Sequence, residues 1–223
     1  MADPYRGFDD SLSRRRTMVD DQIRARGVCD ERVLDVLLRL PRDAFLPAMA
    51  RQTAYEDRAM NIGHGQTISQ PFIVAYMTEQ LLPTPQCTVL EIGTGTGYQT
   101  AVLALLCKHV CTVERISELQ TVAAEVLARL GIANVTFFTG DGSLGLTERA
   151  PFDRIMVTAG APQVPTPLLN QLVDGGVLVA PVGGSNEQTI VRVVRQGART
   201  VETPLLACRF VKLVGQEGWA NEG

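Results

Sequence analysis

The sequence has little of what several kinds of protein require. Only 5% of its 223 residues are aromatic, two residues are histidine, and the formal net charge is −3. No apolar run approaches the length that crosses a bilayer, and the excess of basic residues that a long nucleic-acid-binding surface leaves in a sequence is missing. We therefore expect a protein that contacts neither membrane nor nucleic acid.

The one basic cluster and the cysteines fit this expectation. Arg14-Arg15-Arg16 stands close to Asp20 and Asp21, which favours a solvated face over a nucleic-acid contact. The cysteines are odd in number and lack the paired spacing of a metal site, so we expect buried thiols in a reducing compartment and no metal: they are Cys29, Cys87, Cys107, Cys111 and Cys208. The first residues lack the apolar stretch of a signal peptide, and we expect a cytoplasmic protein.

The first third of the chain is predicted to be helical and then irregular. The spacing predicts helices between residues 13 and 40, with Gly27 ending the first, Asp30 capping the second and Pro41 ending it. Residues 42–70 lack periodicity, and a loop of that length in a compact domain is usually functional or disordered. A further helix is predicted from Pro71 to about Leu82, capped by Ser69 or Gln70.

Strands and helices alternate in the rest of the chain. We predict strands at 88–93, 109–114, 134–140, 152–160 and 175–183, helices at 98–107 and 116–131, and an antiparallel pair at 188–197 and 200–215. The second of these helices carries an apolar face: Leu119, Val122, Val126 and Leu130. The pattern indicates an α/β, Rossmann-like, doubly wound and mainly parallel sheet with antiparallel edge strands. Residues 1–80 would form an N-terminal helical cap with a substrate loop, and 81–223 the core, both packed as one compact unit.

A glycine-rich turn is the strongest local motif. It follows an apolar strand, opens a helix, and reads Glu91-Ile92-Gly93-Thr94-Gly95-Thr96-Gly97. Glycines there let a ligand approach the backbone at the carboxyl end of the strand. Glu114 ends the next strand and can accept both hydroxyls of a ribose. Tight strand-to-helix turns need glycine in any case, so a purely structural turn is the alternative, and Glu114 weighs against it.

The spacing also discriminates between nucleosides. Dinucleotide-binding enzymes carry G-x-G-x-x-G with a pyrophosphate over the helix N-terminus, whereas this turn has G-x-G-x-G followed by Tyr98. Glu91 would oppose a pyrophosphate but suits an ammonium group, and S-adenosylmethionine has an ammonium group and no phosphate. The turn with its downstream acid resembles motif I of the class I methyltransferases. The resemblance implies cofactor contacts from Glu91, Gly93, Thr94, Gly95, Gly97 and Glu114.

A third acidic position, after Glu91 and Glu114, follows the third predicted core strand, at Asp141-Gly142. In class I methyltransferases an acidic or amide residue at this place commonly meets the adenine amino group, so the resemblance implies cofactor contacts from both residues. The alternative is a loop aspartate that forms an Asx-turn.

The irregular segment carries the more specific resemblance. Its block from Gly63 to Pro71, GHGQTISQP, is similar to the substrate loop of the protein-L-isoaspartate O-methyltransferases, and similar blocks follow in order from Met18 to Gly215. The resemblance implies that Ser69 is the catalytic hydroxyl. It also implies that Thr67 and Ile68 line the boundary between cofactor and substrate.

The same resemblance extends to the end of the chain. It implies that Thr67, Ser69 and the run Arg209-Phe210-Val211 bind substrate. Lys212 departs from the family pattern, where proline is usual, and Ser143-Leu144 replaces bulkier residues. His64 stands at a variable position and is given no role.

The residues themselves partly suggest the same chemistry. No Ser-His-Asp or Cys-His combination is readable, and an amine or catechol acceptor would need a base. A carboxylate, with an unperturbed pKa of about 4, is already ionised and needs only placement in line with the methyl group. A site poor in bases therefore fits a carboxylate acceptor. The alternative role for Ser69 is that of a helix N-cap.

These observations lead to one expectation and two alternatives. The resemblance implies a monomeric repair enzyme that transfers methyl from S-adenosylmethionine, leaving S-adenosylhomocysteine, to the α-carboxylate of isoaspartyl residues in damaged proteins and peptides. One alternative is a class I methyltransferase for another carboxylate. The other is a non-catalytic module that binds cofactor or isoaspartate.

Overall fold

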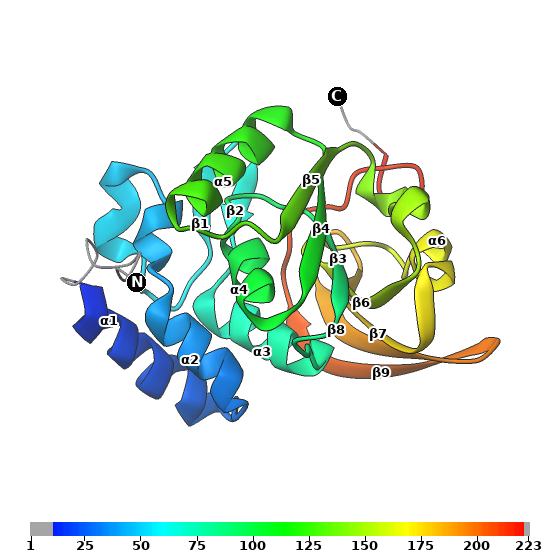
Figure 1. The fold of residues 1–223 in the computed structure, drawn as a ribbon, viewed down its shortest axis with the longest axis horizontal. Coiled ribbons are helices and arrows are strands. Elements are labelled where there is room, and N and C mark those ends of the chain that lie inside the picture. Colours follow the sequence, from blue (N-terminus) through cyan, green and yellow to red (C-terminus); the bar gives the residue numbers. More distant parts are fainter. Residues whose placement is uncertain (1–10, 221–223) are drawn as a thin grey trace.

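The computed structural model describes residues 11–220 and centres on a twisted seven-stranded sheet (Figure 1). The strand order is β5-β4-β3-β6-β7-β8-β9, with parallel pairing from β5 to β7 and antiparallel pairing beyond it. A separate two-stranded hairpin, β1-β2, precedes the sheet in the chain. The strands are β1 (Met60–Gly63), β2 (Gln66–Ile68), β3 (Thr88–Ile92), β4 (His109–Glu114), β5 (Val135–Thr139), β6 (Phe152–Val157), β7 (Leu172–Gly183), β8 (Gln188–Gln196) and β9 (Arg199–Cys208).

Helices cover both faces of this sheet. The α-helices are α1 (Leu12–Thr17), α2 (Glu31–Arg39), α3 (Pro71–Leu81), α4 (Tyr98–Leu106), α5 (Ser117–Arg129) and α6 (Thr166–Asn170). Short π and 3-10 turns complete the described elements: η2 (Met18–Ile23), η3 (Arg24–Arg26), η4 (Arg42–Phe45), η5 (Ala48–Thr53), η6 (Gly142–Leu144) and η7 (Thr147–Arg149). The predicted fold class, a mainly parallel α/β sheet with antiparallel edge strands and N-terminal helices, is confirmed.

The strand residues alternate between two apolar layers. In β3, Val89 packs with α2, α3 and α4 on one face, whereas Leu90 belongs to the cluster on the opposite face, which includes Leu168 of α6. Continuous apolar runs such as Ile155–Val157 arise because the central strands are buried on both faces. The chain order reverses between β3 and β6, so the crossovers diverge there and leave a crevice at the carboxyl ends of these strands.

The N-terminal helices follow the predicted boundaries with two differences. Asp30 caps α2 by accepting a hydrogen bond from the Arg32 backbone N–H at 2.9 Å, and Gly27 ends the preceding turn in a left-handed conformation with φ of 96°. The first helix, however, changes to π and 3-10 turns after Thr17. The expectation that Arg14–Arg16 forms a solvated face is also wrong in part, because Arg15 is only 4% exposed and donates to the Leu38 carbonyl at 2.8 Å.

The apolar face of α5 also differs from the prediction at one residue. Leu119, Val126 and Leu130 are buried as expected, but Val122 is 55% exposed and Ala123 takes the inward position. Ala123 lies close to the turn after β3, because a Cβ built on Gly97 would be 3.0 Å from the Ala123 Cβ.

The segment predicted to be irregular is largely ordered into short elements. It contains η4, η5 and the β1-β2 hairpin before α3 begins at Pro71. The proposed boundary between residues 80 and 81 falls inside α3, and one apolar cluster joins residues from both sides of it. We therefore propose that the cap and the core form a single structural unit.

The end of the chain departs most from the prediction. The hairpin turn lies near Gly197 as expected, but β9 ends at Cys208, so the strand predicted over 200–215 is too long. The following residues leave the sheet and return across the carboxyl ends of the parallel strands, where Lys212 pairs with Gly160. Within residues 11–220 no helix is both long and apolar enough to cross a membrane.

Candidate cofactor and acceptor site

The turn after β3 is shaped by a close contact with the end of β6. Gly93 has φ of 95°, and a Cβ at this position would lie 2.3 Å from Oγ1 of Thr158. The Thr158 hydroxyl donates toward the carbonyl oxygens of Ile92 and Gly93, at 2.9 and 2.7 Å. No residue with a side chain fits Gly93 without displacing this contact.

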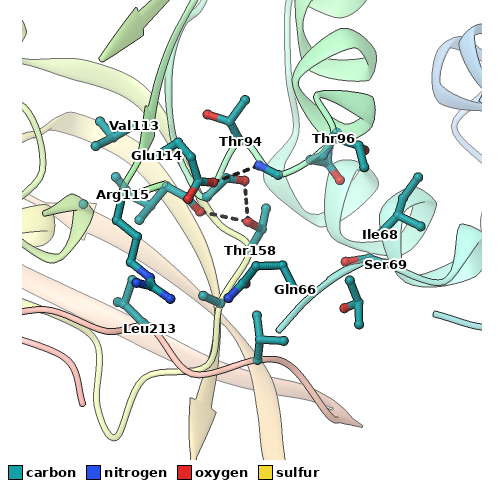
Figure 2. Close-up of a pocket in the computed structure, with 18 of the residues that line it drawn as sticks. Gln66, Ile68, Ser69, Thr94, Thr96, Val113, Glu114, Arg115, Thr158 and Leu213 are labelled. Carbon is teal, nitrogen blue, oxygen red and sulfur yellow. Dashed lines mark hydrogen bonds between the residues drawn. The ribbon is translucent and has the colours of Figure 1, made fainter. Parts of the chain in front are cut away.

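Glu114 holds the glycine turn from the neighbouring strand (Figure 2). Its Oε2 accepts a hydrogen bond from the Gly95 N–H at 2.9 Å, and its Oε1 accepts one from the Ile116 N–H at 3.1 Å. The residue is 7% exposed and lines the pocket that opens above the turn. Each carboxylate oxygen keeps a further lone pair, so the group can also accept from ligand hydroxyls.

Glu91 lies beneath the turn and is not among the residues that line the pocket, and its contact with a ligand ammonium group stays a prediction. Its carboxyl group is fully buried, and Oε2 accepts hydrogen bonds from Oγ1 of Thr100 and of Thr112 at 2.5 and 2.7 Å. Burial raises the pKa of Glu91 to about 8, against hydrogen bonds that lower it. The group therefore supports the turn from inside, largely in its neutral form at neutral pH.

Gly97 also acts through packing instead of lining the pocket. It is the N-cap of α4 with φ of 85°, and a Cβ here would lie 2.8 Å from Cδ1 of Leu127 in α5. The glycine therefore allows α4 and α5 to approach closely. Gly97 is not among the residues that line the pocket, and its contact with the cofactor stays a prediction.

One pocket gathers most of the residues predicted to bind cofactor. It brings the substrate loop against the glycine turn and the end of β4 (Figure 2). The predicted residues that line it are Thr67, Ile68, Ser69, Gly93, Thr94, Gly95, Glu114, Gly142 and Val211.

Asp141 forms the Asx-turn that was the alternative to adenine contact. Its Oδ1 accepts from the backbone N–H and the hydroxyl of Ser143, at 2.9 and 2.6 Å, and its Oδ2 accepts from the Gln216 N–H at 2.7 Å. Asp141 does not line the pocket, whereas Gly142 does. The aspartate thus fastens the returning C-terminal segment to the turn after β5, and its contact with adenine stays a prediction.

Ser69 does not cap α3. The helix begins at Pro71, its N-cap is Gln70, and no side-chain capping bond is made there. The half-buried Ser69 lines the pocket, and no residue in the described part of the chain hydrogen-bonds to its hydroxyl. The hydroxyl is therefore available to a ligand.

A buried arginine fixes the backbone at this serine. Arg42 is fully buried, and its Nη2 donates to the Ser69 carbonyl at 2.7 Å while Nε donates to the Ala54 carbonyl at 2.8 Å. The guanidinium also lies 4.8 Å from the ring centroid of Tyr98, which lines the pocket at the start of α4. Arg42 thereby joins the substrate loop to the helix that follows the glycine turn.

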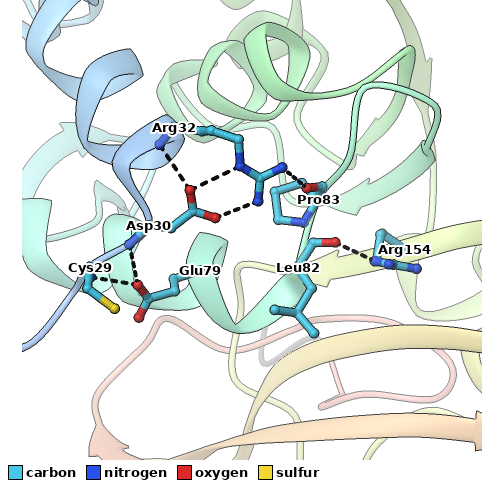
Figure 3. Close-up of polar contacts among 7 residues, drawn as sticks. All are labelled: Cys29, Asp30, Arg32, Glu79, Leu82, Pro83 and Arg154. Atoms are coloured by element: carbon cyan, nitrogen blue, oxygen red, sulfur yellow. Dashed lines mark hydrogen bonds and ion pairs between the residues drawn. The ribbon is translucent and has the colours of Figure 1, made fainter.

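The far end of α3 is fastened to the cap and to the sheet (Figure 3). Oε1 of Glu79 accepts from the backbone N–H groups of Cys29 and Asp30, at 2.7 and 2.8 Å. Just beyond the helix, Arg154 of β6 donates to the Leu82 carbonyl at 3.0 Å. The helix that follows Ser69 is therefore bonded at its far end both to the N-terminal helices and to the sheet.

A second hollow adjoins the pocket on its open side. The two share the residues Gln66, Thr67, Arg115, Val211, Lys212 and Val214. Of the run predicted to bind substrate, Arg209 and Phe210 line only the second hollow, and Val211 lines both. Thr67 therefore stands at the passage between the hollows, with Ser69 on the inner side.

Several pocket residues were missed by the sequence reasoning. Thr158 directly follows β6, and the rule that ligands bind at strand ends would have found it. Leu213 and Val214 line the pocket only because the C-terminal segment returns across it, which a predicted strand over 200–215 conceals. Arg42 has no local signal, because a single arginine after a proline does not reveal its burial.

The donors and acceptors at the glycine turn suit a nucleoside without phosphate. The turn has no basic side chain and offers the Thr96 hydroxyl beside the Glu114 carboxylate, whereas the Thr94 hydroxyl is hydrogen-bonded to that of Thr112. Apolar side chains of Ile92, Val113 and Leu213 supply a surface for a flat ring. Together with the switch-point crevice, these features define the class of S-adenosylmethionine-dependent methyltransferases.

Comparison with known proteins defines the family. The family model "Protein-L-isoaspartate(D-aspartate) O-methyltransferase (PCMT)" matches residues 13–218. The chain is 49% identical to the protein-L-isoaspartate O-methyltransferase of Methanoculleus marisnigri, over 93% of this chain and 94% of that one. It is 50% identical to protein-L-isoaspartate O-methyltransferase 2 of Geotalea uraniireducens, over 93% and 96%.

Solved structures agree with this relationship. One protein-L-isoaspartate O-methyltransferase structure matches with a TM-score of 0.82 and 31% identity, covering 92% of this chain and 67% of that chain. A Plasmodium falciparum protein of the same description, solved in complex with S-adenosyl-L-homocysteine, shares the fold with a TM-score of 0.78 and 23% identity, covering 89% and 97%. The chain belongs to the protein-L-isoaspartate(D-aspartate) O-methyltransferase family.

The buried Glu91 predicts a pH-dependent stability. The ordinary pKa of this group is 4.5, and its pKa in the folded protein is about 8. At pH values between these two, Glu91 holds a proton in the folded state that it has lost in the unfolded state. The free energy of unfolding should therefore fall as pH rises, by about 1.4 kcal/mol per pH unit from this group. Urea unfolding near pH 5.5 and near pH 7.5 should show that Glu91→Gln removes this slope. Glu125→Gln, on the exposed face of α5, is the control; equal slopes in all three proteins would contradict the assignment.

Replacing Glu114 should weaken cofactor binding. Glu114→Ala removes two charge-assisted acceptors, and we expect a loss on the order of 2–3 kcal/mol in the binding of S-adenosylmethionine. Glu114→Gln keeps one oxygen and should bind with intermediate affinity. Calorimetry on variants with wild-type circular dichroism checks this, with Glu125→Ala as control. Unchanged affinity in a folded Glu114→Ala protein would exclude the ribose assignment.

Proposed function

We propose that this chain transfers a methyl group from S-adenosylmethionine to the free α-carboxylate of L-isoaspartyl residues in damaged proteins and peptides. One observation carries the proposal. A single pocket joins the glycine turn and Glu114 to the loop Thr67–Ser69, and the Ser69 hydroxyl faces it without a capping role. The family membership and the open hollow beside Thr67 support the same acceptor.

The proposed chemistry needs placement more than proton transfer. Bound S-adenosylmethionine supplies a methyl group on a positively charged sulfur. A carboxylate oxygen forms a bond to that carbon while the carbon–sulfur bond breaks and its electron pair stays on sulfur, so no proton moves. Ser69 donates a hydrogen bond to the carboxylate and orients it, with Arg42 fixing the loop from behind.

Repair then follows from the ester itself. The methyl ester loses methanol, which is a better leaving group than the oxide that a free carboxylate would have to lose. The backbone nitrogen of the following residue therefore displaces methanol and closes a succinimide. Hydrolysis of that ring yields normal aspartate in part, and the remaining isoaspartate re-enters the site. In this proposal the protein acts as a monomer in the cytoplasm, to which its five free thiols are suited.

Paired peptides test the acceptor. We expect tritium transfer from methyl-labelled S-adenosylmethionine to a peptide with one isoaspartyl residue, and background transfer to the same peptide with an aspartyl residue. The product should release methanol in mild base, as an ester does. Equal labelling of both peptides would indicate another carboxylate acceptor, and labelling of neither would indicate a binding module.

Ser69→Ala tests the role of the hydroxyl. Because Ser69 makes no capping bond, the variant should keep the wild-type melting temperature and bind S-adenosylmethionine nearly normally. Loss of one orienting hydrogen bond should lower kcat/KM for the isoaspartyl peptide by roughly ten- to a thousandfold. Ser117→Ala, at the exposed start of α5, is the matched control. Wild-type turnover by Ser69→Ala would refute the assignment.

A further inference from the structure

One wall of the pocket is formed by the chain that follows β9. Residues 211–219, which we call the C-terminal strap, contribute the apolar side chains of Val211, Leu213 and Val214 to the pocket lining (Figure 2). The strap lies beyond the last strand, which ends at Cys208. Its position is therefore set by separate attachments and not by the ladder of the sheet.

The first attachment is to Gly160, just beyond the end of β6. The Gly160 N–H donates to the Val211 carbonyl at 2.7 Å, and the Leu213 N–H donates to the Gly160 carbonyl at 2.8 Å. The same carbonyl accepts from Nε1 of Trp219 at 2.9 Å. The Trp219 N–H donates in turn to the Leu213 carbonyl at 2.7 Å, so the end of the strap folds back beside the pocket.

The second attachment comes from Ser143, on the turn after β5. Its hydroxyl donates to Oδ1 of Asp141 at 2.6 Å and accepts from the Glu217 N–H at 3.0 Å. Oδ2 of the same aspartate accepts from the Gln216 N–H at 2.7 Å. The strap passes so close that a Cβ built on Gly215 would lie 2.6 Å from Oγ of Ser143. The serine and the strap are therefore closely fitted to each other.

Ser143 does not reach the ligand site itself. It is fully buried, and it is not among the residues that line the pocket or the second hollow. Its neighbour Gly142 does line the pocket. The Ser143 hydroxyl can therefore influence a bound nucleoside only through the groups that it holds, which are Asp141 and the strap.

We propose that Ser143 is a positioning residue for the cofactor, which acts by holding the C-terminal strap against the pocket. The nucleoside packs on Leu213 and Val214 only where the strap is in place. Attachment of the strap and binding of the cofactor are therefore coupled, and each strengthens the other. The inference rests on cofactor binding within the proposed function and is independent of the acceptor.

The single tryptophan of the chain, Trp219, lies on the strap and reports on its attachment. Ser143→Ala removes the bond to the Glu217 N–H and leaves Asp141 accepting from two backbone N–H groups. We expect calorimetry to show an affinity for S-adenosyl-L-homocysteine lowered by about three- to tenfold. Quenching of the Trp219 fluorescence by acrylamide should rise in the free variant and return toward the wild-type value at saturating S-adenosyl-L-homocysteine.

A second variant reaches the same contact from the other side. Gly215→Ala keeps the serine and displaces the strap from it, so it should also weaken binding and increase quenching. Ser117→Ala and Gly184→Ala replace an exposed serine and an exposed glycine away from the strap, and they should change neither quantity.

Wild-type affinity in Ser143→Ala protein with wild-type circular dichroism would overturn the inference. Weaker binding with unchanged quenching would also overturn it, because the effect would then not pass through the strap. None of these measurements uses an acceptor. Failure of the wild-type protein to methylate an isoaspartyl peptide would therefore overturn the proposed function and leave this inference standing.

Discussion

The close contact between the Gly93 backbone and the Thr158 side chain is the constraint on which the site depends. The backbone comes so close to the threonine hydroxyl that this position admits no side chain. The contact fixes the turn between the ends of β3 and β6, where the chain order reverses and the crevice opens. Glu114 then binds the Gly95 N–H from the other side. A turn held from both neighbouring strands presents a preformed surface to the nucleoside, which lowers the entropy lost on binding.

The fold and half of the site could be predicted because they depend on local patterns. Apolar runs in β3, β4 and β6 are long enough to identify buried parallel strands, and glycines mark the turn that follows the first of them. Parallel strands bring their carboxyl ends to one edge of the sheet, so Glu114 could be placed near Gly95 from the sequence alone. Ser69 and Thr67 were located only by resemblance, since a three-residue hairpin strand and the residue after it are too short to show periodicity.

The features of the site that the sequence did not reveal depend on contacts between distant segments. The sequence shows Glu91 and Asp141 beside ligand motifs, but it does not show that Thr100 and Thr112 surround one carboxyl group and that Gln216 bonds the other. Both acids stabilise the turns that line the pocket. The C-terminal return has the same origin, because residues 209–215 continue an apolar and β-branched pattern and leave the sheet only to pack on Gly160. Local propensity does not encode such a departure.

The distribution of charge explains how a site poor in bases can select a carboxylate. An acidic group beside Ser69 would repel the acceptor, and the structure instead places the buried Arg42 behind that residue, where it donates to the carbonyl oxygens of Ala54 and Ser69. Glu91, a buried acid under the turn, is kept largely neutral by its surroundings. Glu114, which lines the pocket, accepts from backbone N–H groups. In the function proposed above, the acceptor thus meets a positive field on its side and a carboxylate on the nucleoside side, and we propose that this orders the two reactants before any bond changes.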